Sequence, residues 1–362
     1  MMPQLPVKEE ASSSAGKLLN FRGMVMKAAT RANGDLPPSS IAFDGGTKNV
    51  MLHKVLLGLI PPHELSDFPF WRRLQFTSIE APLFPFKLGK LDGVHPIVGS
   101  SGPYHVSKRF SLHAISGSRK VCWGSIPVCY AAMLKGGLAF KAFVCHDPQS
   151  DKQSSQRLNM QHACGDFDDW GVRVHAMVGG LFQSGWASAS GFSQAQQQEN
   201  LFTCYYIVLL QVMWQCEKEG GKWEGKFLPS QTVKNVLGLC GHGILGNLMD
   251  AGFPDYRTEL PIEQAFGEVK RPFRGTPNLK DCILGSHLHH LRQLRSLSKN
   301  QSPVPEPAAL RQGLTKEHTV ELAKQGFRSA CIFQSLITIT SKTPKELARQ
   351  KSFHSPFKFF GL

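Results

Sequence analysis

The residues with the clearest chemical potential lie in an acidic and basic segment at 260–274. Pro261 suits the first turn of a helix, where its missing N–H costs no hydrogen bond. Four apolar residues follow at helical spacing: Ile262, Ala265, Phe266 and Val269. Glu263 falls at the edge of this stripe, so a packed helix would present its carboxylate to a cleft. An amphipathic surface helix with a solvated Glu263 is the alternative.

Three cations close the same segment: Lys270, Arg271 and Arg274. At the C-terminal end of a helix they offset the negative end of the dipole, and their side chains are suited to bind phosphates. Pro272 ends or kinks the helix. The segment therefore combines a carboxylate with basic side chains that are suited to bind phosphate.

The run from Ile262 to Arg274 resembles the last-acid segment of Harbinger-type DDE transposases. In that family a catalytic Glu precedes a Phe-Gly pair, a Lys and an aromatic-Arg exit; here these are Glu263, Phe266-Gly267, Lys270 and Phe273-Arg274. Pro272 departs from the pattern. The resemblance implies a ribonuclease H-like sheet with two upstream Asp residues, each following a strand and binding metal together with Glu263.

Asp44 and Asp147 are the upstream acids that fit this implication. Asp44 follows a short apolar run and precedes Gly45-Gly46, which lets the chain turn sharply and an ion approach the backbone. An Asp-Gly turn in which Asp44 caps the next segment is the alternative. Asp147 follows a strand-like run at 138–145.

A second group of acids competes with Asp147 for the second position: Asp166, Asp168 and Asp169. Three carboxylates so close in sequence repel one another unless cations or raised pKa values compensate, and they are more typical of a solvated loop. Asp147 is therefore the preferred second acid.

Converging carboxylates would support two-metal phosphoryl transfer. Two divalent ions about 3.5–4 Å apart stabilise the attacking and leaving oxygens of an in-line displacement, and Mg²⁺ or Mn²⁺ prefers carboxylate oxygens as ligands. Asp44, Asp147 and Glu263 would then be metal ligands rather than general acids or bases. The expected reaction is cleavage or transfer of a DNA strand.

The charge balance favours a polyanionic partner. Across 362 residues, 41 Lys and Arg outnumber 27 Asp and Glu, which gives a formal charge of +14 and favours nucleic acid over an anionic membrane. A basic amphipathic helix is expected at 277–298, and its predicted DNA-contacting side chains include His287, Arg292 and Arg295. A solvated basic face on a packed helix is the alternative.

Other site types have weaker support. The Cys/His pairs lack the C-x₂-C spacing of a strong zinc signal; they are Cys145-His146, His162 with Cys164, Cys240 with His242, and Cys282 with His287. Neither a nucleophile elbow nor a P-loop is found. Nine cysteines, an odd number in a long chain, favour a reducing compartment over a disulfide scaffold.

The pattern of apolar and turn residues predicts the elements that position these groups. Strands are expected at 41–43, 138–145 and 330–340, and a hairpin at 109–115 with 120–128. Helices are expected at 50–60, 129–134, 172–182, 201–214, 232–248 and 315–325, with a linker at 193–200 and an irregular aromatic-packed stretch at 61–103. The apolar run 201–216 falls short of the roughly 20 residues that a membrane span needs.

These expectations combine into an α/β protein with a ribonuclease H-like mixed sheet, interrupted by a mainly helical insertion similar to those of hAT-type families. The expected parts are a mobile leader at 1–38, a β-rich core at 39–150 and the insertion at 151–255. An acidic and a basic helix at 256–300 and a linker with a tail at 301–362 follow. The protein is predicted to be nuclear, or otherwise cytoplasmic. Its expected partner is DNA and not a membrane, and a homo-oligomer is compatible with the sequence. A non-catalytic nucleic-acid-binding protein derived from a transposable element is the alternative function.

Overall fold

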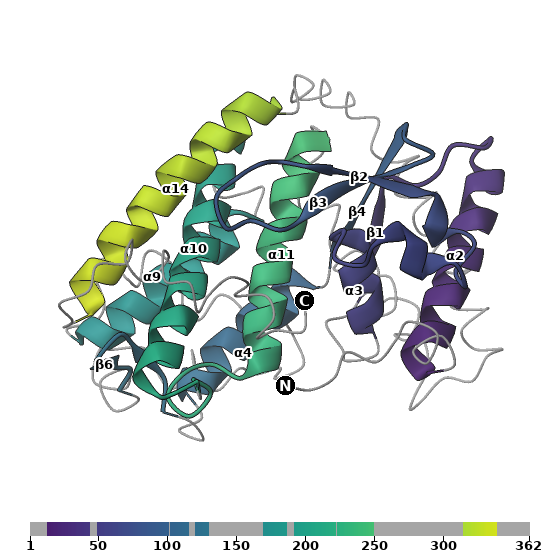
Figure 1. Cartoon of the computed structure of the whole chain (residues 1–362). Helices are drawn as coiled ribbons and strands as arrows, with labels where there is room; N and C mark the ends of the chain where they lie inside the picture. The colour runs from purple at the N-terminus through teal and green to yellow at the C-terminus, as the bar shows by residue number, and fades with distance from the viewer. Residues whose placement is uncertain are drawn as a thin grey trace, which may run out of the picture.

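The computed structural model describes residues 13–43, 49–100, 102–115, 120–129, 169–186, 192–221, 223–249 and 314–338. Within these ranges the chain is a mixed α/β structure. A small sheet and two N-terminal helices lie on one side of α11 (Ser230–Met249), and a group of long helices lies on the other (Figure 1). Helix α11 contacts both β4 (His95–Ser100) of the sheet and α10 (Gln194–Lys218) of the helical group. One hydrophobic cluster includes Val98 of β4 together with the long helices, and a second cluster joins α2 and α3 to buried residues of the sheet such as Leu74 and Ile97.

The sheet is mixed and has the strand order β1-β4-β3-β2. The antiparallel meander consists of β2 (Leu74–Ser78), β3 (Lys87–Leu91) and β4 (His95–Ser100). The short strand β1 (Ser40–Ala42) runs parallel to β4, with Ile41 opposite Gly99. The expectation of a mixed sheet is met, and the expected irregular course at 61–103 is wrong for the residues of the meander.

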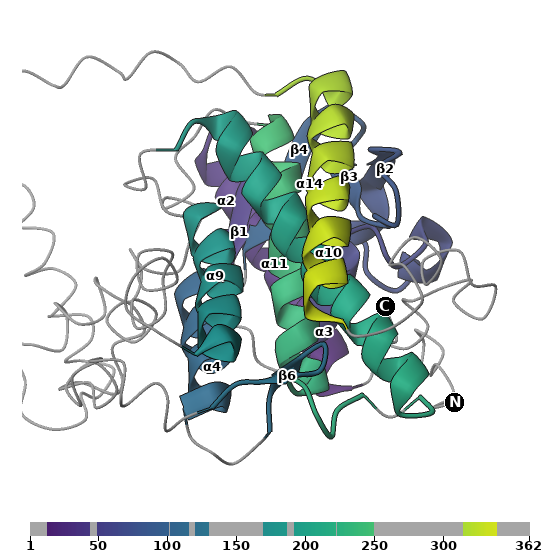
Figure 2. The same cartoon turned by 90° about the vertical axis from the view of Figure 1, so that its left-hand side faces the viewer.

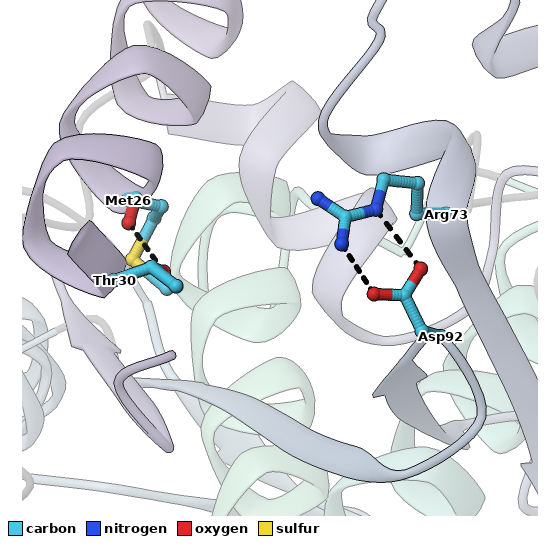
Figure 3. A network of polar contacts seen from close by, with 4 residues as sticks. All are labelled: Met26, Thr30, Arg73 and Asp92. Atoms are coloured by element: carbon cyan, nitrogen blue, oxygen red, sulfur yellow. Dashed lines mark hydrogen bonds and ion pairs between the residues drawn. The ribbon is translucent and has the colours of Figure 1, made fainter. Parts of the chain in front are cut away.

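The β3–β4 turn is held from outside the meander. Asp92 and Gly93 both have positive φ values, +52° and +74°, which the tight turn requires. The Asp92 backbone N–H donates to the Arg73 carbonyl at 3.1 Å, and the Arg73 guanidinium binds the Asp92 carboxylate through two nitrogens (Figure 3). Arg73 ends the 3₁₀ turn η3 (Trp71–Arg73), so this turn and the β3–β4 turn are fixed together.

Residues 14–32 form a helix, which corrects the expectation that 1–38 is a mobile leader. Helix α2 (Ser14–Ala32) begins where the Ser13 side chain accepts from the Gly16 N–H, a standard N-cap. Leu19 and Met26 are buried, and the Trp71 indole N–H donates to the Leu19 carbonyl at 2.9 Å. Near its C-terminal end, the Thr30 hydroxyl donates back to the Met26 carbonyl (Figure 3). The helix is thus part of the packed structure.

The aromatic residues around 68–86 do pack into the core, as the sequence predicted. Phe68, Trp71 and Phe86 are fully buried. Phe68 lies between the 3₁₀ turns η2 (Pro62–Leu65) and η3, and Trp71 is the first residue of η3. Helix α3 (Val50–Leu56) follows β1 and buries Met51, Leu52, Val55 and Leu56. The expected helix at 50–60 is confirmed, with an earlier end.

The expected hairpin at 109–115 and 120–128 is wrong in its first half. Residues 103–115 form helix α4 (Pro103–Ile115), because Val106, Phe110 and Ala114 recur at four-residue spacing and bury one face. The second half itself folds back as a hairpin of β5 (Cys122–Trp123) and β6 (Ile126–Pro127). The expected helix at 129–134 and strand at 138–145 lie outside the described residues, apart from Cys129.

The helical group in the described ranges contains four long helices, and α10 is buried among the other three. They are α9 (Trp170–Ser184), α10 (Gln194–Lys218), α11 and α14 (Lys316–Ile337), and α14 lies along α10 (Figure 2). The expected helices at 172–182, 201–214, 232–248 and 315–325 are confirmed. No helix within the described ranges is both long enough and apolar enough to span a membrane.

Two local expectations in this helical part are wrong. The expected linker at 193–200 is the first part of α10, which starts with a capping box between Ser193 and Gln196. The expected strand at 330–340 is helical as far as Ile337, because Ala330, Phe333 and Ile337 are buried at helical spacing on α14.

Candidate functional site

The residues expected to form the metal site lie outside the described residues. They are Asp44, Asp147 and Glu263. The same holds for the expected nucleic-acid contacts Lys270, Arg271, Arg274, His287, Arg292 and Arg295, and for the rival acids Asp166 and Asp168. Their convergence therefore stays a prediction. Asp169 is described, and its carboxylate accepts from the Val172 N–H at 2.9 Å as the N-cap of α9.

The chain leading into Asp44 is held by aromatic rings. Phe43 follows β1 directly and is 3% exposed. Its ring meets His53 of α3 edge-on, with ring centroids 5.1 Å apart, and His242 of α11 at 6.1 Å. Two helices far apart in sequence thus fix the backbone that precedes the first expected metal ligand.

The two histidines also contact each other. His242 Nε2 lies 3.1 Å from His53 Nδ1, so one ring donates and the other accepts. Burial lowers the pKa of His53 to about 4 and holds that of His242 well below its ordinary value. The ring of His53 is partly exposed but packs against the rings of Phe43 and His242. This packing removes water from both histidines and so lowers the pKa of each. Both rings are uncharged at pH 7.

The same cluster has a polar atom that no described residue satisfies. His242 is fully buried, and its Nδ1 has no hydrogen-bond partner within the described ranges. The ring is closely packed against Gly99, because a Cβ there would lie 2.8 Å from His242 Cε1. The described residues contain no group of three His, Cys, Asp or Glu side chains placed to hold a metal ion.

The Cys240 and His242 pair, one of the zinc candidates, is part of this core. Cys240 is fully buried, and its thiol forms a hydrogen bond with the thiol of Cys204. Burial raises the pKa of the Cys240 thiol well above its ordinary value. The cysteines in the described ranges carry free thiols: Cys122, Cys129, Cys204, Cys216, Cys240 and Cys331. The remaining zinc candidates, Cys145-His146, His162 with Cys164, and Cys282 with His287, lie outside these ranges.

A further buried histidine pins α4 to α9. The Trp123 indole N–H donates to His175 Nδ1 at 3.1 Å, which leaves Nε2–H to donate to the Phe110 carbonyl at 3.1 Å. The rings of His175 and Phe110 stack with centroids 4.3 Å apart. Burial lowers the pKa of His175 to about 3. A neutral, fully bonded ring without solvent access serves packing rather than proton transfer.

A cavity of about 380 Å³ opens between the C-terminal end of α10 and the β5–β6 hairpin. Its charged and hydrogen-bonding lining side chains are predominantly donors, and the lining consists of Lys120, Cys122, Gly124, Ser125, Pro127, Trp214, Gln215, Lys218, Glu219 and Lys226. No sequence pattern indicated this cavity, because Trp214 and Gln215 belong to an apolar run that indicates only a buried helix. The available signal was the four-residue spacing that puts Lys218 beside Trp214 and Glu219 beside Gln215.

One buried amide fixes the hairpin wall of this cavity. Gln211 accepts from the Gly124 N–H at 2.9 Å and donates to the Cys122 carbonyl at 3.1 Å. Gln334 of α14 donates to the same Gln211 oxygen at 3.3 Å. Gly124 has a positive φ of +56°, and a Cβ there would lie 2.0 Å from the Ile337 carbonyl oxygen, so only glycine fits. The hairpin therefore has one defined position against α10 and α14.

Comparison of the chain with protein-family models, with curated proteins and with solved structures finds no match.

Proposed function

We propose that this chain is a DDE transposase-like protein that cleaves or transfers DNA strands with two divalent metal ions, or a degenerate descendant of such an enzyme. One observation carries the proposal furthest. A strand of a mixed sheet ends at Ala42, and the buried Phe43 that follows packs against histidine rings of α3 and α11, directly before Asp44 in the sequence.

Such an anchor is what a metal ligand at a strand end requires. Catalytic ligands need to be held within about 0.5 Å of their working positions by packed neighbours. Phe43 supplies that support from a dry and uncharged environment, since burial keeps His53 and His242 neutral at pH 7. In the proposed site a bound metal ion would balance the charge of Asp44.

The remaining parts of the proposed site follow the resemblance. Asp147 and Glu263 would complete the ligand set for Mg²⁺ or Mn²⁺, in a ribonuclease H-like arrangement of the sheet. Lys270, Arg271, Arg274 and the basic helix at 277–298 would bind the DNA backbone. A nuclear location and self-association are parts of the same proposal, as transposition requires access to chromosomal DNA.

The alternative is a non-catalytic nucleic-acid-binding protein, which the formal charge of +14 favours independently of any carboxylate. It predicts DNA binding without cleavage. Because binding releases counterions, its affinity should fall with salt at a slope of about 0.9 log units per log unit for each phosphate neutralised.

Nicking of supercoiled plasmid by the purified full-length chain in Mn²⁺ or Mg²⁺ tests the proposal. We expect relaxed and linear products that chelation of the metal removes. Asp44→Ala and Glu263→Ala should each abolish nicking, while Glu268→Ala, a change to the same residue type in the same segment, should retain it. DNA binding measured in parallel shows whether each variant still associates with its substrate.

Nicking that persists in Glu263→Ala would overturn the assignment of the site. Wild-type chain that binds DNA with the expected salt dependence but never nicks it would support the non-catalytic alternative. Wild-type chain that neither binds nor nicks DNA would overturn both.

A further inference from the structure

We propose that the exposed face of α2 binds an acidic amphipathic helix of a partner protein. This face, the α2 seam, consists of Phe21, Met24, Val25 and Ala28, with Lys17 and Arg31 at its two ends. The inference does not rest on the proposed strand-cleaving function, because none of these residues belongs to the expected metal site or to the expected DNA contacts.

Large apolar side chains are exposed together on α2. Phe21 is 53% exposed, Met24 64% and Val25 42%, and their spacing of three and four residues places them on one side of the helix. Ala28 continues the stripe by one turn and is exposed as well. Single exposed apolar residues are common on protein surfaces, whereas a contiguous exposed group is the mark of an interaction surface.

The seam is not needed to hold α2 in the fold. The opposite side of the helix carries the buried residues Leu19, Gly23 and Met26, and a Cβ at Gly23 would lie 3.1 Å from Phe70 Cβ. The Trp71 indole N–H fixes the same side through the Leu19 carbonyl. Helix α2 lies at the edge of the molecule, on the far side of α3 from α11 (Figure 1). A helix that is already fixed therefore presents the seam to solvent.

The charge of α2 has one sign. Its four charged residues are the cations Lys17, Arg22, Lys27 and Arg31, and the segment 14–32 contains no Asp or Glu. None of the four forms an ion pair with another described residue. Asp35, in the turn after the helix, is the nearest described acid along the chain. A partner of complementary charge is therefore acidic.

The pattern along the seam specifies the shape of the partner. At a rise of about 1.5 Å per residue, Lys17 and Arg31 are separated by about 21 Å along the helix axis, and the apolar residues lie between them. A partner helix of about four turns matches this arrangement if apolar residues occupy its centre and carboxylates lie near both ends. Coiled coils use the same combination of an apolar seam and flanking charges to select their partners.

Other occupants fit the seam less well. A second copy of the chain would bring cations against cations, because α2 carries no acid. DNA phosphates would pair with the lysines and arginines but would leave Phe21, Met24 and Val25 exposed. Binding of an amphipathic helix to a membrane scales with the apolar area that it buries, and this stripe is short and bounded by Lys17 and Arg31. An acidic helix satisfies both the apolar and the charged residues of the seam.

A designed acidic helix tests the proposal with the full-length chain. The probe is a fluorescent peptide of about three heptads, with Leu at the a and d positions and Glu at the flanking positions. We expect its anisotropy to rise on titration with the chain, and added salt should weaken binding because part of the attraction is electrostatic. A peptide of the same composition in shuffled order should not bind, and neither should one with Lys in place of Glu.

Matched variants separate the seam from general surface effects. Met24→Glu should weaken binding of the Glu peptide by about tenfold or more, because it places a like charge within the apolar stripe. Ile332→Glu changes a side chain that is 65% exposed on α14, on the other side of α11 (Figure 1), and should leave the affinity unchanged. Both positions are exposed, so neither change should alter the urea midpoint of the free protein.

Reversal of the end charges tests the electrostatic part directly. The double variant Lys17→Glu with Arg31→Glu should lose affinity for the Glu peptide and gain affinity for the Lys peptide. A role of these two residues in folding alone would not produce such an exchange.

Wild-type chain that does not bind the Glu peptide would overturn the proposal, and so would binding that survives in Met24→Glu. Two further results would also overturn it by identifying a different occupant. Binding to phosphatidylserine vesicles that Met24→Glu abolishes would assign the seam to a membrane. Dimerisation in analytical ultracentrifugation that Met24→Glu abolishes would assign the seam to a second copy of the chain.

Discussion

His242 Nε2 lies 3.1 Å from His53 Nδ1, and both rings contact the ring of Phe43, which directly follows β1. The residues come from three elements that are distant in sequence, and none carries a charge at pH 7. This contact joins the sheet to α11. One of the three residues, Phe43, directly precedes Asp44, the first acid of the proposed metal site, in the sequence.

Acid should destabilise the fold through its buried histidines. The folded pKa values, about 4 for His53 and about 3 for His175, lie below the ordinary 6.5, so the unfolded chain binds more protons between those values. The free energy of unfolding should be highest above pH 6.5 and should fall as the pH drops towards 3. His175 alone should account for about 5 kcal/mol of this loss.

Urea denaturation followed by circular dichroism across this pH range measures that fall. His113, which disfavours the charged form of His175, contributes in the same direction. A free energy of unfolding that stays constant from pH 6.5 to pH 4 would contradict the expectation.

Gly99→Ala should destabilise the junction of β4, α3 and α11. A Cβ at Gly99 would lie 2.8 Å from His242 Cε1, 2.8 Å from Leu56 Cδ1 and 2.9 Å from Phe43 Cε1. Overpacking of this kind costs about 1–3 kcal/mol, measured as a lower urea midpoint. Gly225→Ala meets no atom within 4 Å and should change the free energy of unfolding by less than about 0.5 kcal/mol. Equal effects of the two changes would be inconsistent with this packing.

Gln211→Met should release the β5–β6 hairpin. The change leaves the Gly124 N–H, the Cys122 carbonyl and the Gln334 amide without their shared partner in the core. We expect a loss of about 3 kcal/mol or more in the free energy of unfolding, together with faster hydrogen exchange at Gly124. Gln231→Met, at a half-buried position on α11, should cost far less. Unchanged exchange at Gly124 would show that Gln211 does not hold the hairpin.

Arg73→Met should have little effect on stability despite its two-point contact with Asp92. The side chains are 46% and 48% exposed, and exposed ion pairs contribute about 0–1 kcal/mol. The pKa of the Asp92 carboxyl is lowered, chiefly by the hydrogen bond from Arg73, so it should return towards its ordinary value in the variant. Titration followed by NMR measures that change. A loss well above 1 kcal/mol would mean that the pair also positions the β3–β4 turn.

The sequence by itself determined the long helices, because their burial follows from local periodicity. Thr315 is the N-cap of α14 in the structure, and the apolar run at 201–216 is the buried centre of α10. Periodicity failed where a short apolar segment suits both a strand and a helix. The segment 109–115 is helical because Phe110 and Ala114 pack towards α9 and α11, a choice that depends on residues far along the chain.

Only the tertiary structure decided which polar groups meet. The contact of His53 with His242 spans 189 residues, and the link from Gln211 to Gln334 spans 123. No spacing within either segment encodes such pairs. The buried donors of Trp214 and Gln215 follow the same logic, since a residue type indicates that a group can donate, whereas only the surrounding fold determines whether an acceptor is present.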